Sequence, residues 1–187
     1  MGYTGGNDVH QAQEVGPGRR TGTGSRTCLG FGTQLRRRAE PRLALIALGW
    51  SKNERALPKL VEVLEEENFG YWPRADACDA IARIGSPKAI PVLRKCLKSE
   101  TFHALPNAFR ALVALGDREA VPLAVARVGP EIEAYNSGSV VRELEKVTGQ
   151  SFGFERQRWQ EWWKSVESEW QIPEEFRKPW DQQPAVY

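Results

Sequence analysis

Apolar residues in the body of the chain recur at intervals of three and four positions, the spacing that lines one face of an α-helix. Clear runs are Leu60, Val63 and Leu64, then Leu93 and Leu97, then Leu123 and Val128. Valine and isoleucine follow this period of about 3.6 and not the period of two that a strand requires. The pattern therefore predicts an all-α protein.

Four glycines show that the helical pattern repeats. The segments LALIALG, CDAIARIG, FRALVALG and RELEKVTG end at Gly49, Gly85, Gly116 and Gly149, with spacings of 36, 31 and 33 residues. Three of these glycines are followed by an Ala-x-Pro tripeptide, at 56–58, 89–91 and 120–122. A repeat of this length is typical of stacked supersecondary units that share one core.

Each unit begins with signals for one helix. A proline precedes the glycine by eight to twelve residues, at Pro41, Pro73 and Pro106, and proline is well tolerated in the first turn of a helix. Small residues five positions before the glycine, Ala44, Ala80 and Ala111, allow a neighbouring helix to approach closely. The glycine is expected to end the helix, because glycine adopts the left-handed cap conformation at little cost.

A second helix follows the glycine. Ser86 and Asp117 are expected to be its N-caps. The proline of Ala-x-Pro falls near its first turn and should bend or reset the helix. Each unit is therefore a helical hairpin with an apolar seam, which is buried only when hairpins stack.

Two segments carry a resemblance to a known family. RADACDAIARIGSPKAIPVLRKCL (74–97) and FRALVALGDREAVPLAVARV (109–128) resemble HEAT repeats of the short type first described in phycobilisome lyases. The resemblance covers about residues 40–168 and implies a right-handed α-solenoid of about four helical hairpins. The first unit departs from the template, with three extra residues in WSKNERALPK (50–59) and a longer, aromatic link in EENFGYWPR (66–74).

The last unit is unusually aromatic. Trp159, Trp162 and Trp163 share one helical face, and Phe154 precedes that helix. We expect these four residues to form the cap of the last seam, with a ligand-gripping aromatic face as the alternative. The stretch 144–163 resembles the closing unit of many bacterial HEAT-repeat proteins. Three aromatic residues of the Pro-rich tail, Trp170, Phe176 and Trp180, are expected to fold back on this cap or to dock elsewhere.

Composition divides the chain into three parts. Residues 1–35 hold nine of the seventeen glycines and few large apolar residues, so we expect a disordered Gly/Arg-rich head. Residues 36–169 form the repeat domain and residues 170–187 the tail. Residues 1–38 carry a net charge of 6 − 2 = +4, which leaves 2 − 4 = −2 for the remainder. A mildly acidic body argues against nucleic-acid binding.

The sequence offers no constellation for catalysis or metal binding. The two histidines, His10 and His103, are far apart, and the three cysteines, Cys28, Cys78 and Cys96, lack C-x-x-C spacing. Free thiols and the lack of a visible signal peptide favour a cytoplasmic location, although a start site placed too far downstream would have removed such a peptide. No apolar run is long enough to span a membrane. Charged residues at positions 74, 76, 79 and 83 are expected to pair within one helix.

What remains is a binding surface. The predicted partner-binding residues are polar positions of the second helices, which line the concave side of such solenoids, with two aromatic residues at the irregular edge: Lys59, Glu62, Arg94, Lys98, Arg127, Tyr71 and Trp72. We therefore expect a monomeric, non-enzymatic scaffold or adaptor without a cofactor, which binds a protein or peptide segment on its concave face. A bilin lyase or lyase subunit, with Arg94 and Arg127 meeting the bilin propionates, is the alternative. A HEAT-like DNA glycosylase is disfavoured by the acidic body.

Overall fold

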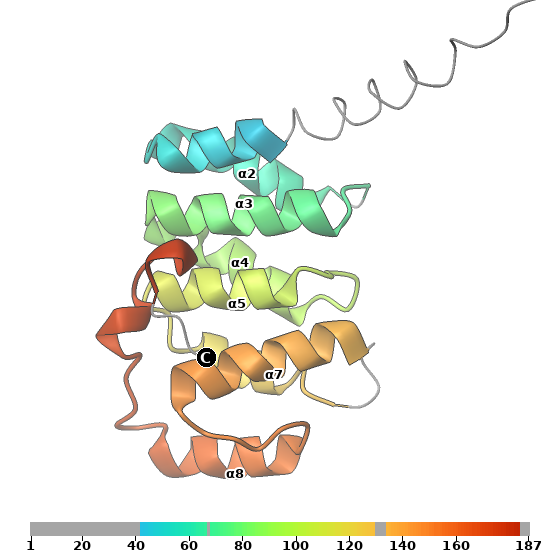
Figure 1. Ribbon diagram of the computed structural model, residues 1–187, viewed down its shortest axis with the longest axis vertical. Coiled ribbons are helices and arrows are strands. Elements are labelled where there is room, and N and C mark those ends of the chain that lie inside the picture. Colours follow the sequence, from blue (N-terminus) through green and yellow to red (C-terminus); the bar gives the residue numbers. More distant parts are fainter. Residues whose placement is uncertain (1–41, 67, 130–133, 184–187) are drawn as a thin grey trace, which may run out of the picture. The chain divides into compact units, whose positions relative to one another are not determined.

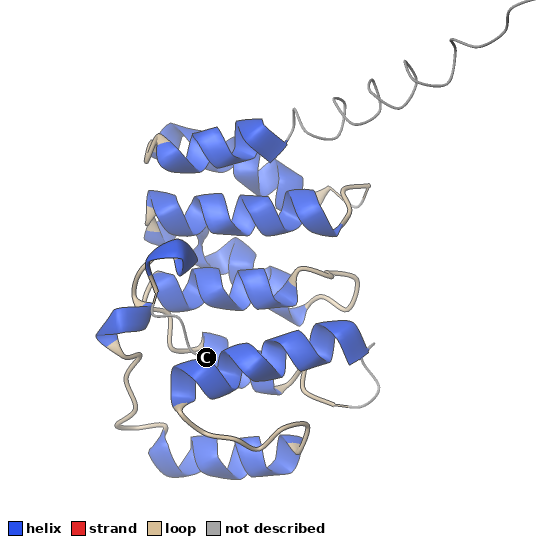
Figure 2. Cartoon of the chain, in the orientation of Figure 1, coloured by secondary structure: helices blue, strands red, loops and turns tan. Residues whose placement is uncertain are grey.

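The computed structural model describes residues 42–66, 68–129 and 134–183 of the chain. They belong to one compact unit, Arg36–Tyr187. The Gly-rich head (1–35) that the sequence predicts to be disordered lies outside the described residues, as does Pro41. The described part of the chain contains helices, turns and loops and no strand (Figure 2), which confirms the all-α prediction.

The helices follow one another as a series of hairpins. Residues 42–50 are helical and are followed by η1 (Glu54–Ala56), α2 (Leu57–Glu65), α3 (Tyr71–Ile84), η2 (Pro87–Ala89), α4 (Ile90–Lys98), α5 (Leu105–Ala114), α6 (Ala120–Val125), α7 (Ala134–Thr148) and α8 (Arg156–Val166). The tail adds two 3-10 turns, η3 (Glu174–Phe176) and η4 (Trp180–Gln182).

The hairpins stack into two layers (Figure 1). The first-helix layer contains residues 42–50, α3, α5 and α7, and α5 packs against both α3 and α7. The second-helix layer contains α2, α4, α6 and α8, where α4 packs against α2 and α6, and α6 against α8. Buried apolar residues from both layers join in a single core. This is the α-solenoid that the repeat predicts.

Three of the four marker glycines end a helix in the predicted way. Gly85, Gly116 and Gly149 have φ values of 73°, 78° and 72°. The prediction for Gly49 is wrong, because the helix continues to residue 50 and Lys52 takes the left-handed conformation instead, with φ 50°. Gly49 is needed for a different reason. A Cβ atom at this position would lie 2.7 Å from the Ala80 Cα atom, so the glycine lets the first helix approach α3.

Two of the three Ala-x-Pro prolines reset the chain as predicted, whereas Pro122 is the third residue of α6 and follows no 3-10 turn of the described chain. Pro58 and Pro91 are each the second residue of an α-helix, and each follows a 3-10 turn, η1 or η2. The cap predictions are only partly right. Ser86 has the extended backbone of an N-cap but its hydroxyl makes no capping hydrogen bond. The Asp117 Oδ1 atom accepts a hydrogen bond from the Glu119 amide at 3.3 Å.

The aromatic residues of α8 close the core. Trp159 is fully buried and its Nε1 atom donates a hydrogen bond to the Gly153 carbonyl at 2.9 Å. Trp163 is buried as well, and Trp162 packs against it. The assignment of Phe154 to this cap is wrong, since 51% of its surface is exposed. The preceding aromatic residue, Phe152, takes that place with its ring centroid 5.0 Å from that of Trp159.

The tail returns along the first-helix layer (Figure 1). Trp170 stays on the cap, 5.6 Å from Trp163 between ring centroids. Phe176 is buried beneath Lys146 of α7, and Trp180 lies against Arg110 of α5. Asp181 then reaches Arg83 of α3 at 3.3 Å. The tail therefore contacts three successive units. No helix in the described ranges is both long and apolar enough to cross a membrane.

Candidate functional site

Two faces of the stack are candidates for binding, one on each helix layer. The second-helix face carries the charged residues that the sequence predicts to bind a partner. Lys59 and Glu62 lie on α2, where their side chains are mostly exposed and pair with each other at 2.8 Å. Lys98 is exposed at the end of α4. This face is therefore polar and accessible at these three positions.

The other two predicted charges of this face, Arg94 and Arg127, are half-buried. The Arg94 guanidinium donates two hydrogen bonds to the Asp117 carboxylate, from Nε at 2.7 Å and from Nη2 at 2.5 Å. This contact raises the pKa of the Arg94 guanidinium. The pair joins α4 to the turn before α6, so Arg94 connects two units. Arg127 is half-buried after α6, and its Nε atom has no hydrogen-bond acceptor among the described residues.

Exposed ion pairs also join the second helices of neighbouring units and the 3-10 turns that precede them. Lys95 contacts Glu65 at 2.9 Å, and Lys88 contacts Glu54 at 2.6 Å. Exposed pairs of this kind contribute little to stability, but they neutralise charge along the face.

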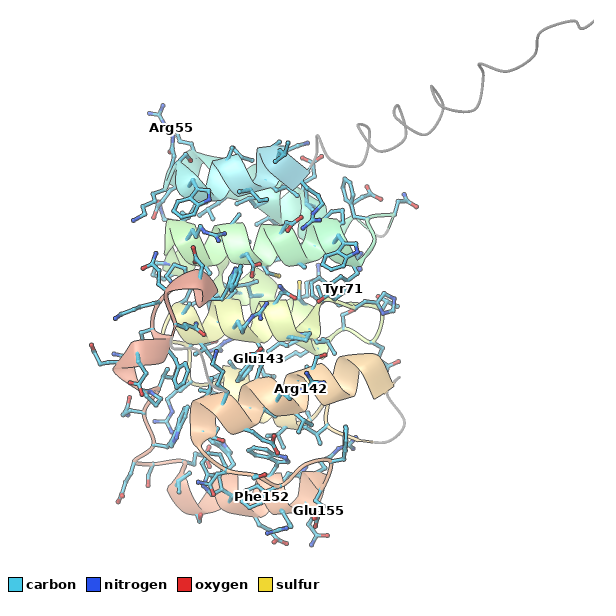
Figure 3. The ribbon with its side chains drawn as sticks, viewed as in Figure 1. Arg55, Tyr71, Arg142, Glu143, Phe152 and Glu155 are labelled. Carbon is cyan, nitrogen blue, oxygen red and sulfur yellow. The ribbon has the colours of Figure 1, made fainter. Side chains whose placement is uncertain are left out.

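Tyr71 lies on the first-helix face (Figure 3), and Trp72 follows it in the first turn of α3. The Tyr71 hydroxyl donates a hydrogen bond to the Asn107 Oδ1 atom of α5 at 3.2 Å. Trp72 is 59% exposed and stands edge-on to Tyr71. The sequence places both residues at the edge of the second-helix groove. The structure separates them from that groove because α3 is a first helix.

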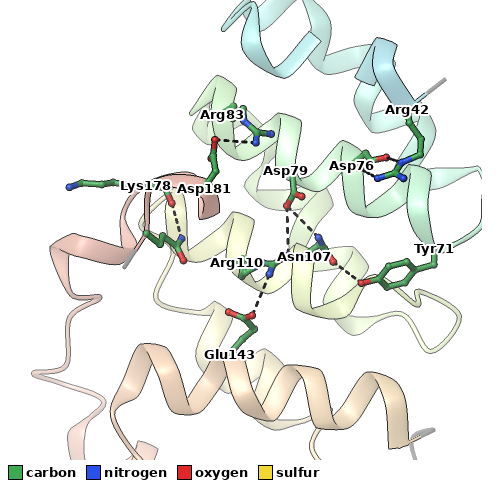
Figure 4. Close-up of polar contacts among 11 residues, drawn as sticks. Arg42, Tyr71, Asp76, Asp79, Arg83, Asn107, Arg110, Glu143, Lys178 and Asp181 are labelled. Atoms are coloured by element: carbon green, nitrogen blue, oxygen red, sulfur yellow. Dashed lines mark hydrogen bonds and ion pairs between the residues drawn. The ribbon is translucent and has the colours of Figure 1, made fainter. Parts of the chain in front are cut away.

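A row of polar side chains crosses the first-helix face (Figure 4). The Asn107 Nδ2 atom donates to Asp79 Oδ1 at 3.3 Å, and Arg110 Nη2 lies 4.0 Å from the same oxygen. Arg110 Nη1 reaches Glu143 of α7 at 3.4 Å. Asp79, Arg110 and Glu143 therefore link α3, α5 and α7 with alternating charge. Beside the row, Arg142 and Glu143 help to line a hollow of about 170 Å³.

Burial raises the pKa of one carboxyl group of this row, that of Asp79. The Asp79 side chain is only 17% exposed, and this burial raises its pKa to about 6 in spite of the opposing effects of Arg110 and Asn107. A carboxyl group of this kind takes up a proton near the middle of the physiological range. The charge of the row therefore depends on the protonation of Asp79.

The prediction that residues 74, 76, 79 and 83 pair within one helix is wrong. Asp76 binds Arg42 of the first helix at 2.6 Å, and Arg83 binds Asp181 of the tail. Arg74 donates only to backbone carbonyls. The physical reason is that the polar face of α3 lies against neighbouring elements, which offer partners in better geometry than the helix itself.

Three exposed tryptophans lie on the first-helix face, and each is stacked with an arginine. Trp72 lies 5.1 Å from the Arg42 guanidinium, Trp50 lies 4.9 Å from Arg83, and Trp180 lies 5.8 Å from Arg110. Trp50 is 57% exposed and Trp180 is 44% exposed. These contacts fix the indole rings while leaving one side of each accessible.

The sequence contained a signal for part of this face that its interpretation missed. Asp79, Arg110 and Glu143 each stand six residues before a marker glycine, at Gly85, Gly116 and Gly149. Equivalent positions of stacked repeats lie one above another. Opposite charges at equivalent positions therefore predict a row across the units. Trp50 had no comparable signal.

The described residues contain no group of three or more histidine, cysteine or carboxylate side chains suited to a metal ion. Cys78 and Cys96 are free and buried. Burial raises the pKa of Cys78 well above its ordinary value and that of Cys96 to about 11, so neither thiol is an activated nucleophile. His103 is exposed in the loop before α5. His10 and Cys28 lie outside the described residues.

Comparison with known proteins gives two matches. Residues 68–135 match the model of the HEAT repeats. The chain is also 29% identical over 105 residues to the phycocyanobilin lyase subunit alpha of Picosynechococcus sp., a match that covers 51% of this chain and 39% of that protein. No solved structure gives a significant match.

Proposed function

Because the chain contains HEAT repeats, we propose that it is a non-enzymatic scaffold that binds a partner protein. The observation that carries this proposal is the set of three half-exposed tryptophans, Trp50, Trp72 and Trp180, each stacked with an arginine. Tryptophan and arginine are the residues most enriched in the energetic centres of protein interfaces. A repeat solenoid presents them on an extended rigid surface.

The contacts of the two faces favour the first-helix face as the partner-binding surface. On the second-helix face, Arg94 and Lys95 are engaged in pairs within the chain, and a partner would have to replace those pairs. On the first-helix face, the indole surfaces of Trp50 and Trp72 are exposed and held in place. Burial of exposed aromatic surface is a major source of binding free energy.

A capture experiment tests the proposal and distinguishes the faces. The full chain is immobilised and exposed to lysate of its source cells, and captured proteins are then purified and their Kd values measured. The Trp50→Ala/Trp72→Ala double variant should weaken binding by about tenfold or more. The matched control, Lys59→Ala/Lys98→Ala, changes two exposed residues of the other face and should bind like the wild type.

Other results of the capture experiment would place the binding site elsewhere or contradict the proposal. Weakened binding in the Lys59→Ala/Lys98→Ala variant alone would place the site on the second helices, as the sequence predicts. If both variants bind as tightly as the wild type, neither pair of substituted residues lies in the binding site. Failure of the wild-type chain to retain any protein at micromolar concentration would contradict the scaffold proposal.

The match to a lyase subunit supports a second candidate, a protein that takes part in bilin attachment. The identity of 29% over 105 residues is the observation that favours it. Of the two arginines expected to meet the propionates, Arg94 already holds Asp117, which weakens this candidate. Titration of the full chain with phycocyanobilin tests it by visible absorbance. A spectrum that equals the sum of the separate components would exclude bilin binding.

A further inference from the structure

Arg74 of α3 is buried between two hollows of the surface. Only 6% of the residue is exposed. One hollow, of about 180 Å³, lies beside Lys95 and Ser99, and the other, of about 320 Å³, lies beside Gly70. Arg74 and Thr101 line both. The guanidinium is therefore removed from bulk solvent yet borders space in which a ligand fits.

The bonding of this guanidinium is incomplete. Arg74 Nη2 donates to the Glu66 carbonyl at 2.9 Å, and Nη1 donates to the Thr101 carbonyl at 3.4 Å. The Nε atom is buried and has no acceptor among the described residues. No carboxylate of the described chain forms an ion pair with Arg74, whereas the half-buried Arg83 and Arg110 pair with Asp181 and Glu143.

An unpaired buried charge is costly, and proteins generally supply an opposite charge for it. Here the surroundings favour an anion. Glu65, the carboxylate that borders the smaller hollow, is occupied by Lys95 at 2.9 Å. Helix α3 begins after Gly70 at the rim of the larger hollow, and the first turn of a helix carries partial positive charge.

We propose that Arg74 is a binding site for a carboxylate ligand. A guanidinium has five N–H groups, and the two carbonyl contacts leave one further proton on each Nη atom for a carboxylate to accept. The Arg74 guanidinium lies over the Phe102 ring, 5.3 Å from its centroid, and this contact fixes the orientation of the guanidinium plane. The ligand is either a small free carboxylate or an acidic side chain of another protein. The site is separate from the tryptophans of the first-helix face, so the test of carboxylate binding does not depend on the scaffold proposal.

Thermal unfolding of the full chain tests the site. Sodium glutarate is titrated against sodium chloride of equal ionic strength, because a ligand that binds only the folded state raises the Tm. We expect a saturable rise in Tm for the wild type and a loss of affinity of about tenfold or more in Arg74→Met. Arg118→Met is the matched control, since Arg118 also has a buried Nε without an acceptor but lies against Trp163. It should respond like the wild type.

A second variant covers the case in which Arg74→Met does not fold. A Cβ at Gly70 would meet no atom within 4 Å, so Gly70→Glu is tolerated and places a carboxylate at the larger hollow. This variant should lose the response to glutarate. A peptide with blocked termini and one central glutamate identifies the source: a response to the peptide alone indicates a protein side chain, and equal responses indicate that a free carboxylate suffices.

Three results would overturn the proposal. The first is a wild-type Tm that responds equally to glutarate and chloride, which would show only an effect of ionic strength. The second is an unchanged glutarate affinity in both Arg74→Met and Gly70→Glu. The third is a rise in Tm with glutarate that appears in Glu67→Gln but not in the wild type. This result would show that a carboxylate of the chain itself already neutralises Arg74.

Discussion

At the scale of single residues, the first-helix face depends on charges that are held partly out of water. Asp79 is the clearest case, because its neighbours do not fully offset its burial. Arg110, Asn107 and Arg83 lower its pKa, Asp76 raises it, and burial outweighs the lowering. The consequence is a carboxyl group whose protonation is linked to folding.

The pH dependence of stability should reveal this linkage. The pKa of Asp79 is about 6 in the folded protein and 3.8 in the reference state, so the folded state binds the proton more tightly. The free energy of unfolding should therefore fall as the pH rises from about 4 to about 6.5, by on the order of 3 kcal/mol for this group. Urea unfolding at several pH values measures the effect.

Asp79→Asn should lose this part of the pH dependence and approach or exceed the wild-type stability at pH 7. Glu62→Gln removes an exposed carboxylate and serves as the control, with a change within about 0.5 kcal/mol. If the wild type and Asp79→Asn show parallel pH profiles, the Asp79 proton is not linked to folding.

At the scale of elements, close contacts between helices set the stacking of the units. The first helix approaches α3 so closely that only a glycine fits opposite Ala80. The second helices are joined differently, through the Arg94–Asp117 pair. One contact depends on the absence of a side chain, and the other depends on two charged side chains.

Gly49→Ala tests the first contact. The added methyl group would overlap the Ala80 backbone, and such overpacking costs about 1–3 kcal/mol. Gly70→Ala is the control, because its Cβ would lie in open space. Chemical denaturation compares them. A Gly49→Ala protein as stable as the wild type would mean that the two helices separate at no cost.

Asp117→Ala tests the second contact. The Asp117 side chain is 5% exposed, whereas that of Arg94 is 39% exposed. The variant loses the ion pair and the hydrogen bond to the Glu119 amide, so we expect a loss of about 2 kcal/mol or more. Lys59→Ala, which breaks an exposed pair, should cost no more than about 0.5 kcal/mol. Equal losses in both variants would rule out a structural role for the inter-unit pair.

At the scale of the whole folded unit, the tail connects repeats that are distant in sequence. Repeat units normally contact only their neighbours, so their stability is a sum of local terms. Here the segment from Ile172 to Asp181 contacts α7, α5 and α3. The tail should therefore make the unfolding of the described units more cooperative.

Phe176→Ala tests this role of the tail. Truncation of the buried ring should lower the free energy of unfolding by about 3 kcal/mol. It should also speed amide hydrogen exchange in both the tail and the last turn of α3, where Asp181 binds Arg83. Phe154→Ala removes an exposed ring and is the control. Faster exchange confined to residues near 176 would show that the tail does not couple the units.

The sequence alone determined the features that depend on neighbours within about one helical turn. Helical periodicity, the glycine stops at Gly85, Gly116 and Gly149, the resetting prolines and the buried face of Trp159 and Trp163 are all of this kind. Their signals are local because the backbone conformation and the i, i+3 and i, i+4 contacts that produce them are local. The length of the repeat then implied the stacking.

Only the tertiary structure decided which charged and aromatic residues meet. Asp76 pairs across units with Arg42, and Arg83 pairs with the tail, although spacing along α3 suggested pairs within the helix. Gly49 likewise appeared to be a helix stop and is a contact point. The reason is physical: these partners lie roughly 30 to 100 residues apart, so their meeting depends on how the hairpins stack and on where the tail returns.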